Sequence, residues 1–124
     1  MRNDEQLLQL RPDLGLDLGN SKGEERFQNE TLRPILKWQH LLLKTMFEHY
    51  IQKRKGVYFA LPKAARPAWV ADSIRSDLRF RNLLAGTVIG QFTEAELRFF
   101  NEHETECMRR LVALTIERLQ SEEF

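Results

Sequence analysis

The sequence predicts an all-α domain, built as an up-down-up bundle of three long helices. Glycine and proline are scarce, at 6 and 4 of 124 residues, which favours helices over turns and strands. Apolar residues recur in three stretches with the 3.6-residue period of a helix that buries one face. No alternating apolar pattern is long enough to build a sheet. We expect helices of similar length over about 31–55, 67–90 and 94–120, joined by short connections.

The last helix has the clearest start signal in the chain. Thr93 has the hydroxyl of an N-cap, and Glu96, three residues later, completes a capping box. Phe92 and Leu97 have the spacing of a hydrophobic staple around this cap. We therefore expect one helix from this cap to about residue 120. Its predicted buried face consists of Leu97, Phe100, Met108, Leu111, Leu114 or Thr115, and Leu119.

A run of polar residues, 101–106, interrupts this apolar face. Glu104 stands where the period requires an apolar residue, seven positions after Leu97 and seven before Leu111. One interpretation is that neighbouring helices diverge here and that Glu104 is solvated or paired with an arginine. The other is a buried polar site that binds a small molecule. Its candidate ligand-binding residues are Glu104, His103, Asn101, Arg79, Arg81 and His40.

The two earlier helices have weaker boundaries. Pro34 fits only a first turn, so the pattern predicts either a short helix over about 24–31 followed by a break, or one helix kinked near Pro34. Gly56 is the expected residue after the end of the first long helix. The middle helix should begin at Pro67 and be kinked or broken near Ser76, where polar residues shift the phase of the apolar pattern.

Both ends of the chain are expected to lie outside the helical domain, which we place at 23–121. Residues 1–22 mix Pro, Gly, Asp and Asn without a helical or strand period, and this predicts a flexible N-terminal segment. Its six leucines favour docking along a groove, on this chain or on a partner. Residues 122–124 are expected to be a frayed C-terminus.

The net charge of +1 hides an asymmetry between the ends and the middle of the chain. Residues 1–31 carry −3, residues 32–92 carry +8 and residues 93–124 carry −4. The basic middle invites a nucleic-acid interpretation. We instead expect the acidic last helix to neutralise Arg79 and Arg81 within the bundle, so that nucleic acid is not a partner.

Two features predict a cytoplasmic protein without a membrane partner. The longest apolar stretch without a charge, 83–92, is far shorter than the ~20 residues of a membrane helix, and the N-terminus does not fit a signal peptide. Cys107 is the only cysteine, which excludes an internal disulfide and agrees with a reducing compartment. We expect Cys107 to act as a small apolar residue.

Several chemistries lack their motifs. No histidine belongs to a Glu-x-x-His pair of the kind used by helical di-iron bundles. The sequence HETEC at 103–107 has Cys where a zincin helix needs its second His. The chain has no glycine-rich phosphate loop, no Cys-x-x-Cys pair and no nucleophile-elbow motif. We therefore expect no metal site and no cofactor.

Three stretches together carry a family resemblance: EERFQNETLRPILKWQH at 24–40, RFRNLLAGTVIGQFTEAEL at 79–97 and IERLQS at 116–121. They resemble a family of small bacterial proteins of uncharacterised activity, some of which carry the label glyoxalase. The resemblance implies a bacterial protein, spans roughly 24–121 and brings no functional residues with it. Glyoxalase I-type enzymes use βαβββ modules with metal ligands on strands, and this sequence has neither, so we infer no glyoxalase activity.

For function, two classes remain. The first is a non-enzymatic interaction or regulatory module that acts as a homodimer or through a protein partner. Leu41, Trp38 and Phe99 lie off the main apolar stripes and are candidates for its surface. The second is a small-molecule or metal site around Glu104, which would allow an enzyme. This second class requires Glu104 to be buried.

Overall fold

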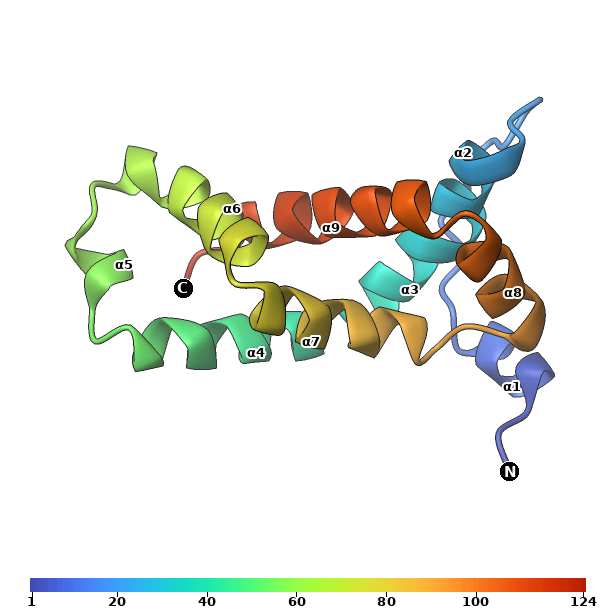
Figure 1. The fold of residues 1–124 in the computed structure, drawn as a ribbon, viewed down its shortest axis with the longest axis horizontal. Coiled ribbons are helices and arrows are strands. Elements are labelled where there is room, and N and C mark those ends of the chain that lie inside the picture. The colour runs from blue at the N-terminus through green and yellow to red at the C-terminus, as the bar shows by residue number, and fades with distance from the viewer.

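The computed structural model describes all 124 residues and consists of helices and loops without strands. The all-α prediction is therefore confirmed. The long helices α4, α7 and α9 run along the long axis of the molecule, with α2, α8 and α1 gathered at one end and α5 at the other (Figure 1). No helix combines the length and apolar character needed to cross a membrane. The elements are α1 (Asp4–Gln9), α2 (Gly23–Phe27), the π-helix η1 (Gln28–Leu32), α3 (Arg33–Trp38), α4 (His40–Lys53), α5 (Val57–Ala60), the 3-10 helix η2 (Lys63–Ala65), α6 (Arg66–Ser76), α7 (Leu78–Ile89), α8 (Glu94–Glu102) and α9 (Glu104–Gln120).

Each of the three predicted long helices is divided in two. The first changes direction at Gln39, whose backbone has φ −92° and ψ 7°. The predicted break near Ser76 occurs one residue later, at Asp77, whose carboxylate accepts a hydrogen bond from the Phe80 amide at 3.1 Å and so caps α7. Ser76 does not cap α7, because its hydroxyl donates to the Asp72 carbonyl.

The expectation of one helix over 94–120 is wrong, because His103 breaks it between α8 and α9. His103 has φ −126° and ψ 36°, outside the helical region. Its ring Nδ1 lies 3.0 Å from the Phe99 carbonyl, and since a carbonyl only accepts, Nδ1 carries the proton. The ring also stacks on Phe99 at 4.2 Å. The polar residues around this position bury no apolar face, so packing does not enforce a straight helix here.

A π-helical turn accommodates Pro34. Proline has no amide to donate back along the helix, and η1 directly precedes it. The Arg33 amide donates to the Gln28 carbonyl, five residues back, instead of to the usual fourth residue. Phe27, Gln28, Leu32 and Arg33 keep right-handed helical backbone angles, so the chain passes through this turn without the break that the first sequence interpretation predicts.

Two antiparallel helix pairs form the body of the fold. In the first, Gln39 Nε2 donates to the Thr87 carbonyl at 3.1 Å and Arg54 pairs with Asp77 at 3.2 Å, so α4 and α7 run side by side in opposite directions. In the second, Gln120 Nε2 donates to the Pro67 carbonyl at 2.9 Å, which places the end of α9 beside the start of α6. The two antiparallel pairs do not confirm the predicted up-down-up bundle of three long helices.

The core contains two aromatic groups. Phe47, Tyr50 and Phe80 pack between α4 and α7, with the Tyr50 and Phe80 rings 4.2 Å apart. At the other end, Phe92 contacts Phe27 edge-on at 5.5 Å. Leu97 is 40% exposed and so does not belong to the predicted buried face. Residues of that face that are buried are Phe100, Leu111, Leu114, Thr115 and Leu119.

Cys107 lies on α9 and is fully buried. Burial in apolar surroundings, followed by the negative charge of Glu24 on α2, raises the pKa of its thiol. The residue therefore packs as a small apolar side chain and is not a reactive thiolate.

The last residues contact the body of the fold. Phe124 packs against Phe47 at 5.2 Å and Tyr58 at 5.8 Å. Glu122 Oε1 lies 2.6 Å from His40 Nε2. These contacts involve the segment for which the sequence predicts fraying.

We expect Leu111→Ala to lower the free energy of unfolding by about 2–5 kcal/mol, because Leu111 is fully buried and its loss leaves a cavity. Leu97→Ala is the matched control, and it should cost less than about 1 kcal/mol because Leu97 is half-exposed. Urea denaturation followed by circular dichroism measures both values. Equal losses would contradict the position of Leu97 at the surface.

Candidate functional site

The most densely connected polar group of the chain is the carboxylate of Glu96, in the first turn of α8. Glu96 Oε1 accepts a hydrogen bond from the Thr93 amide at 2.8 Å. The Glu96 amide donates to Thr93 Oγ1 at 3.3 Å. The predicted capping box is thus confirmed.

The same carboxylate receives an arginine from the N-terminal segment. Arg11 Nη1 lies 2.6 Å from Glu96 Oε2, and Arg11 Nη2 lies 2.7 Å from Glu96 Oε1. This two-pronged geometry is the strongest form of a carboxylate–guanidinium pair. Only 8% of the Arg11 side chain and 16% of the Glu96 side chain are exposed. Arg11 Nη2 also donates to the Gln91 carbonyl at 2.8 Å.

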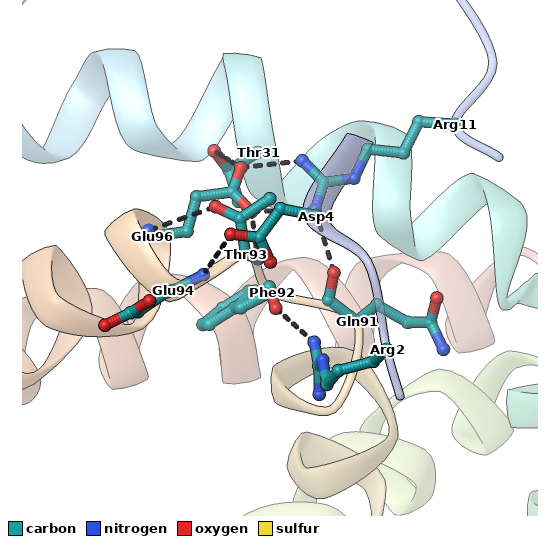
Figure 2. Close-up of polar contacts among 9 residues, drawn as sticks. All are labelled: Arg2, Asp4, Arg11, Thr31, Gln91, Phe92, Thr93, Glu94 and Glu96. Atoms are coloured by element: carbon teal, nitrogen blue, oxygen red, sulfur yellow. Dashed lines mark hydrogen bonds and ion pairs between the residues drawn. The ribbon is translucent and has the colours of Figure 1, made fainter. Parts of the chain in front are cut away.

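A third segment reaches this carboxylate from the π-helix. Thr31 is buried in η1, and its hydroxyl donates to Glu96 Oε2 at 2.9 Å. Figure 2 shows Thr31 and Arg11 approaching Glu96 from different segments. The carboxylate therefore joins two distant segments to the start of α8. Arg11 of the N-terminal segment is 85 residues from Glu96 in sequence, and Thr31 of η1 is 65 residues from it.

Further contacts fasten the N-terminal segment to the α7–α8 turn. The Arg2 guanidinium donates to the Phe92 carbonyl. The Glu94 amide donates to Asp4 Oδ2 at 3.3 Å (Figure 2). Leu8, Leu10 and Leu16 remain among the exposed apolar residues. The segment is therefore held chiefly by charged and polar groups at Arg2, Asp4 and Arg11, and these leucines contribute little burial.

Opposing effects act on the pKa of Glu96. Burial alone would raise this pKa, because it disfavours the charged carboxylate. The hydrogen bond from Arg11, the Thr93 amide and the charge of Arg11 together outweigh burial and hold the pKa below its usual range. The carboxylate is therefore ionised, and its partners stabilise the charged form.

The six candidate ligand-binding residues of the sequence analysis do not converge on one site. Glu104 and Asn101 are exposed, so Glu104 does not form a buried polar site. The ring Nδ1 of His103 is hydrogen-bonded to the Phe99 carbonyl at the helix break, and Arg79 is exposed on α7. Only Glu104 and Arg81 share a surface hollow.

His40 lies elsewhere, at the start of α4. Its Nε2 is 2.6 Å from Glu122 Oε1, and Arg118 Nη1 is 3.3 Å from its Nδ1. Because a guanidinium only donates, Nδ1 accepts from Arg118, and Nε2 donates to Glu122. The hydrogen bond from His40 lowers the pKa of Glu122. His40 thus joins α4 to the end of the chain.

The expected neutralisation of Arg79 and Arg81 by the last helix does not occur. Four carboxylates of residues 93–124 pair with other groups: Glu94 with Arg98, Glu96 with Arg11, Glu106 with Arg109 and Arg110, and Glu122 with His40 and Lys44. The hydrogen bonds from Arg109 and Arg110 lower the pKa of Glu106 to about 2. None of the carboxylates of this stretch forms an ion pair with Arg79 or Arg81.

Sequence reasoning identified Glu96 as part of a cap but missed its role as an anchor. The capping signal is local, whereas Arg11 and Thr31 are distant in sequence. No motif around Arg11 marks it as a partner. A weak indication was available in the leucines of 1–22, which favoured docking, although the contacts formed are polar.

We expect Glu96→Gln to lower the free energy of unfolding by about 3 kcal/mol, because the amide cannot accept all the donors that surround Glu96 and leaves the Arg11 charge buried without its partner. Glu94→Gln is the matched control on the same turn. Its pair with Arg98 is exposed, so the loss should be below about 0.5 kcal/mol. Urea denaturation at pH 7 measures both. Similar losses would show that the Arg11 pair does not hold the segment.

The stabilisation by Glu96 should also depend on pH. Its folded-state pKa lies below the unfolded value of about 4.3, so the contribution is complete above that value and is lost as the pH falls through the folded-state pKa. The stability difference between the native chain and Glu96→Gln should therefore shrink steadily below about pH 4.3, because protonated Glu96 resembles glutamine. A difference that stays constant from pH 7 to pH 3 would contradict the lowered pKa.

The described polar groups are thus arranged for joining segments. No group of three or more His, Cys, Asp or Glu side chains is placed to hold a metal ion. The chain was compared with protein-family models, with curated proteins and with solved structures, and no match was found in any of the three.

Proposed function

We propose that this chain is a non-enzymatic helical interaction module that works as a homodimer. The observation that carries the proposal is a group of large apolar side chains exposed on α3, α4 and α7. Trp38 is 47% exposed, Leu41 74%, Leu42 45% and Leu83 59%. We call these four residues the α4/α7 apolar surface.

Three of these residues lie close together in sequence, around the junction of α3 and α4. Trp38 ends α3, and Leu41 and Leu42 are in the first turn of α4. The Gln39 amide donates to the Ile35 carbonyl and the Leu43 amide donates to the Gln39 carbonyl, so hydrogen bonds link both helices to the residue at which the direction changes.

Leu83 joins these residues from α7. The contact of Gln39 with Thr87 fixes the register of the two helices. Leu42 lies about one turn after Gln39, and Leu83 one turn before Thr87. Because α4 and α7 run in opposite directions, both steps lead the same way along the pair, so Leu42 and Leu83 are neighbours.

A second copy of the chain is the occupant that this surface fits best. A symmetric dimer places the same patch on both partners, so one apolar surface is sufficient to form the whole interface. Gly86, one turn after Leu83, is exposed, and no atom lies within 4 Å of the position where a Cβ would be. Its lack of a side chain allows a partner helix to approach closely. Tryptophan at such a surface supplies a large anchor.

Phe99 is not part of this surface, although the sequence made it a candidate. Its ring stacks on Phe27 at 5.0 Å and on His103 at 4.2 Å. These contacts satisfy Phe99 within its own chain. The proposed interface therefore keeps Trp38 and Leu41 and adds Leu42 and Leu83.

The cytoplasm is the proposed location of this module. The single cysteine is buried and reduced, which suits a reducing compartment. The α4/α7 apolar surface supports a protein partner, and we propose neither a membrane nor a nucleic acid for it.

We expect the native chain to be a dimer at micromolar concentration, and Leu41→Glu to weaken the dimer at least about 100-fold, because it places a charge in an apolar interface. Size-exclusion chromatography with light scattering over a concentration series measures the dissociation constant. Val57→Glu is the matched control, since Val57 is also exposed, at 47%, but lies on α5. A native monomer, or equal dissociation of both variants, would reject the proposed interface.

A further inference from the structure

A hollow of about 450 Å³ opens between α6, α7 and α9. The helices α6 and α9 lie side by side (Figure 1). Its apolar floor comes from one face of α9, with Met108, Val112 and Ala113. Its polar wall consists of Arg75, Arg81, Arg109, Glu104 and Thr105. The hollow shares no residue with the α4/α7 apolar surface.

The arginines of this wall are not equivalent. The Arg109 guanidinium is engaged by Glu106, with distances of 3.0 Å and 2.6 Å. Arg75 and Arg81 form neither an ion pair nor a side-chain hydrogen bond, and Glu104 pairs with neither of them although it lines the same hollow. Two unpaired positive charges and one unpaired carboxylate therefore line the hollow, which leaves an excess of positive charge.

Arg81 is the most constrained of these groups. Its Nε is buried, and no acceptor of the chain lies within hydrogen-bonding distance. Buried donors are usually satisfied. The Nε atoms of Arg11 and Arg66 also lack a partner, but of the three arginines only Arg81 lines this hollow. The planar fork of arginine matches an oxyanion, whether a carboxylate or a phosphate.

We propose that this hollow binds a small organic anion whose carboxylate or phosphate lies against Arg81 and Arg75. The compact apolar part of the ligand would cover Met108 and Val112 on the floor. Glu104 opposes the anion from the rim, so it limits affinity and disfavours ligands with a high negative charge. Arg81 supplies the directional contact, and Arg75 supplies a second charge.

A small anion fits these observations better than a nucleic acid does. A nucleic-acid surface requires basic groups that follow an extended backbone. Arg79 is on the same helix as Arg81 and is exposed, but it does not line the hollow. The unpaired arginines that lie beside apolar residues, Arg75 and Arg81, are therefore confined to one concave site.

Binding can be followed through the methyl signal of Met108 by NMR. The probes are inorganic phosphate and benzoate, added separately at constant ionic strength, with chloride as the reference anion. We expect saturable shifts of Met108 with one or both probes and none with chloride. Benzoate alone would indicate a carboxylate ligand, and phosphate alone would indicate a phosphate ester.

Matched variants assign the contact. Arg81→Gln should weaken binding at least about tenfold, which corresponds to about 1.4 kcal/mol. Arg79→Gln removes the same charge from the same helix outside the hollow, and it should change affinity by less than about twofold. Glu104→Gln should tighten binding, because it removes the opposing charge. Unchanged thermal melting shows that each variant is folded.

Two results would overturn the proposal. The first is the absence of a saturable Met108 shift with either probe up to about 20 mM, because a dissociation constant above that concentration is too weak for a functional site. The second is an equal loss in Arg79→Gln and Arg81→Gln, which would replace the hollow by a diffuse basic surface. If an oligonucleotide then bound with the same equal loss, that surface would be a nucleic-acid site.

Discussion

The ionised carboxylate of Glu96 is the interaction on which the arrangement of this chain depends. It accepts from the Thr93 amide, from both terminal nitrogens of Arg11 and from the Thr31 hydroxyl. A carboxylate offers about four lone-pair positions, and these four donors use them all. A charge with so little exposure would be costly alone, but full pairing makes it a junction between three distant segments.

The helix breaks determine which surfaces the chain presents. The change of direction at His103 separates α8, which holds the N-terminal segment through Glu96, from the long helix α9. Because α9 begins at Glu104, that carboxylate lies at the rim of the hollow beside Arg81 and not in the core. The helix α4 belongs to the first predicted long helix, and α7 is the half of the second that follows Asp77. The proposed interface and the proposed anion site therefore use different parts of the fold.

Sequence reasoning succeeded where the signal was local. The cap at Thr93, the interruption near Ser76 and the helical class follow from residues within one or two turns of each other. It failed where the outcome depended on distant partners. The period placed Leu97 inside because it assumed one straight helix, and the break at His103 removed that assumption. The pairing of Arg11 with Glu96 crosses 85 positions, and no local pattern encodes it.

The position of the sole cysteine gives the chain a built-in reporter. Cys107 is fully enclosed, close enough to Glu24 of α2 for that carboxylate to affect its ionisation. A thiol-alkylating reagent reaches the sulfur only when its covering moves away, because burial both blocks access and keeps the thiol protonated. The labelling rate of the unmodified chain therefore measures how often this end of the molecule opens.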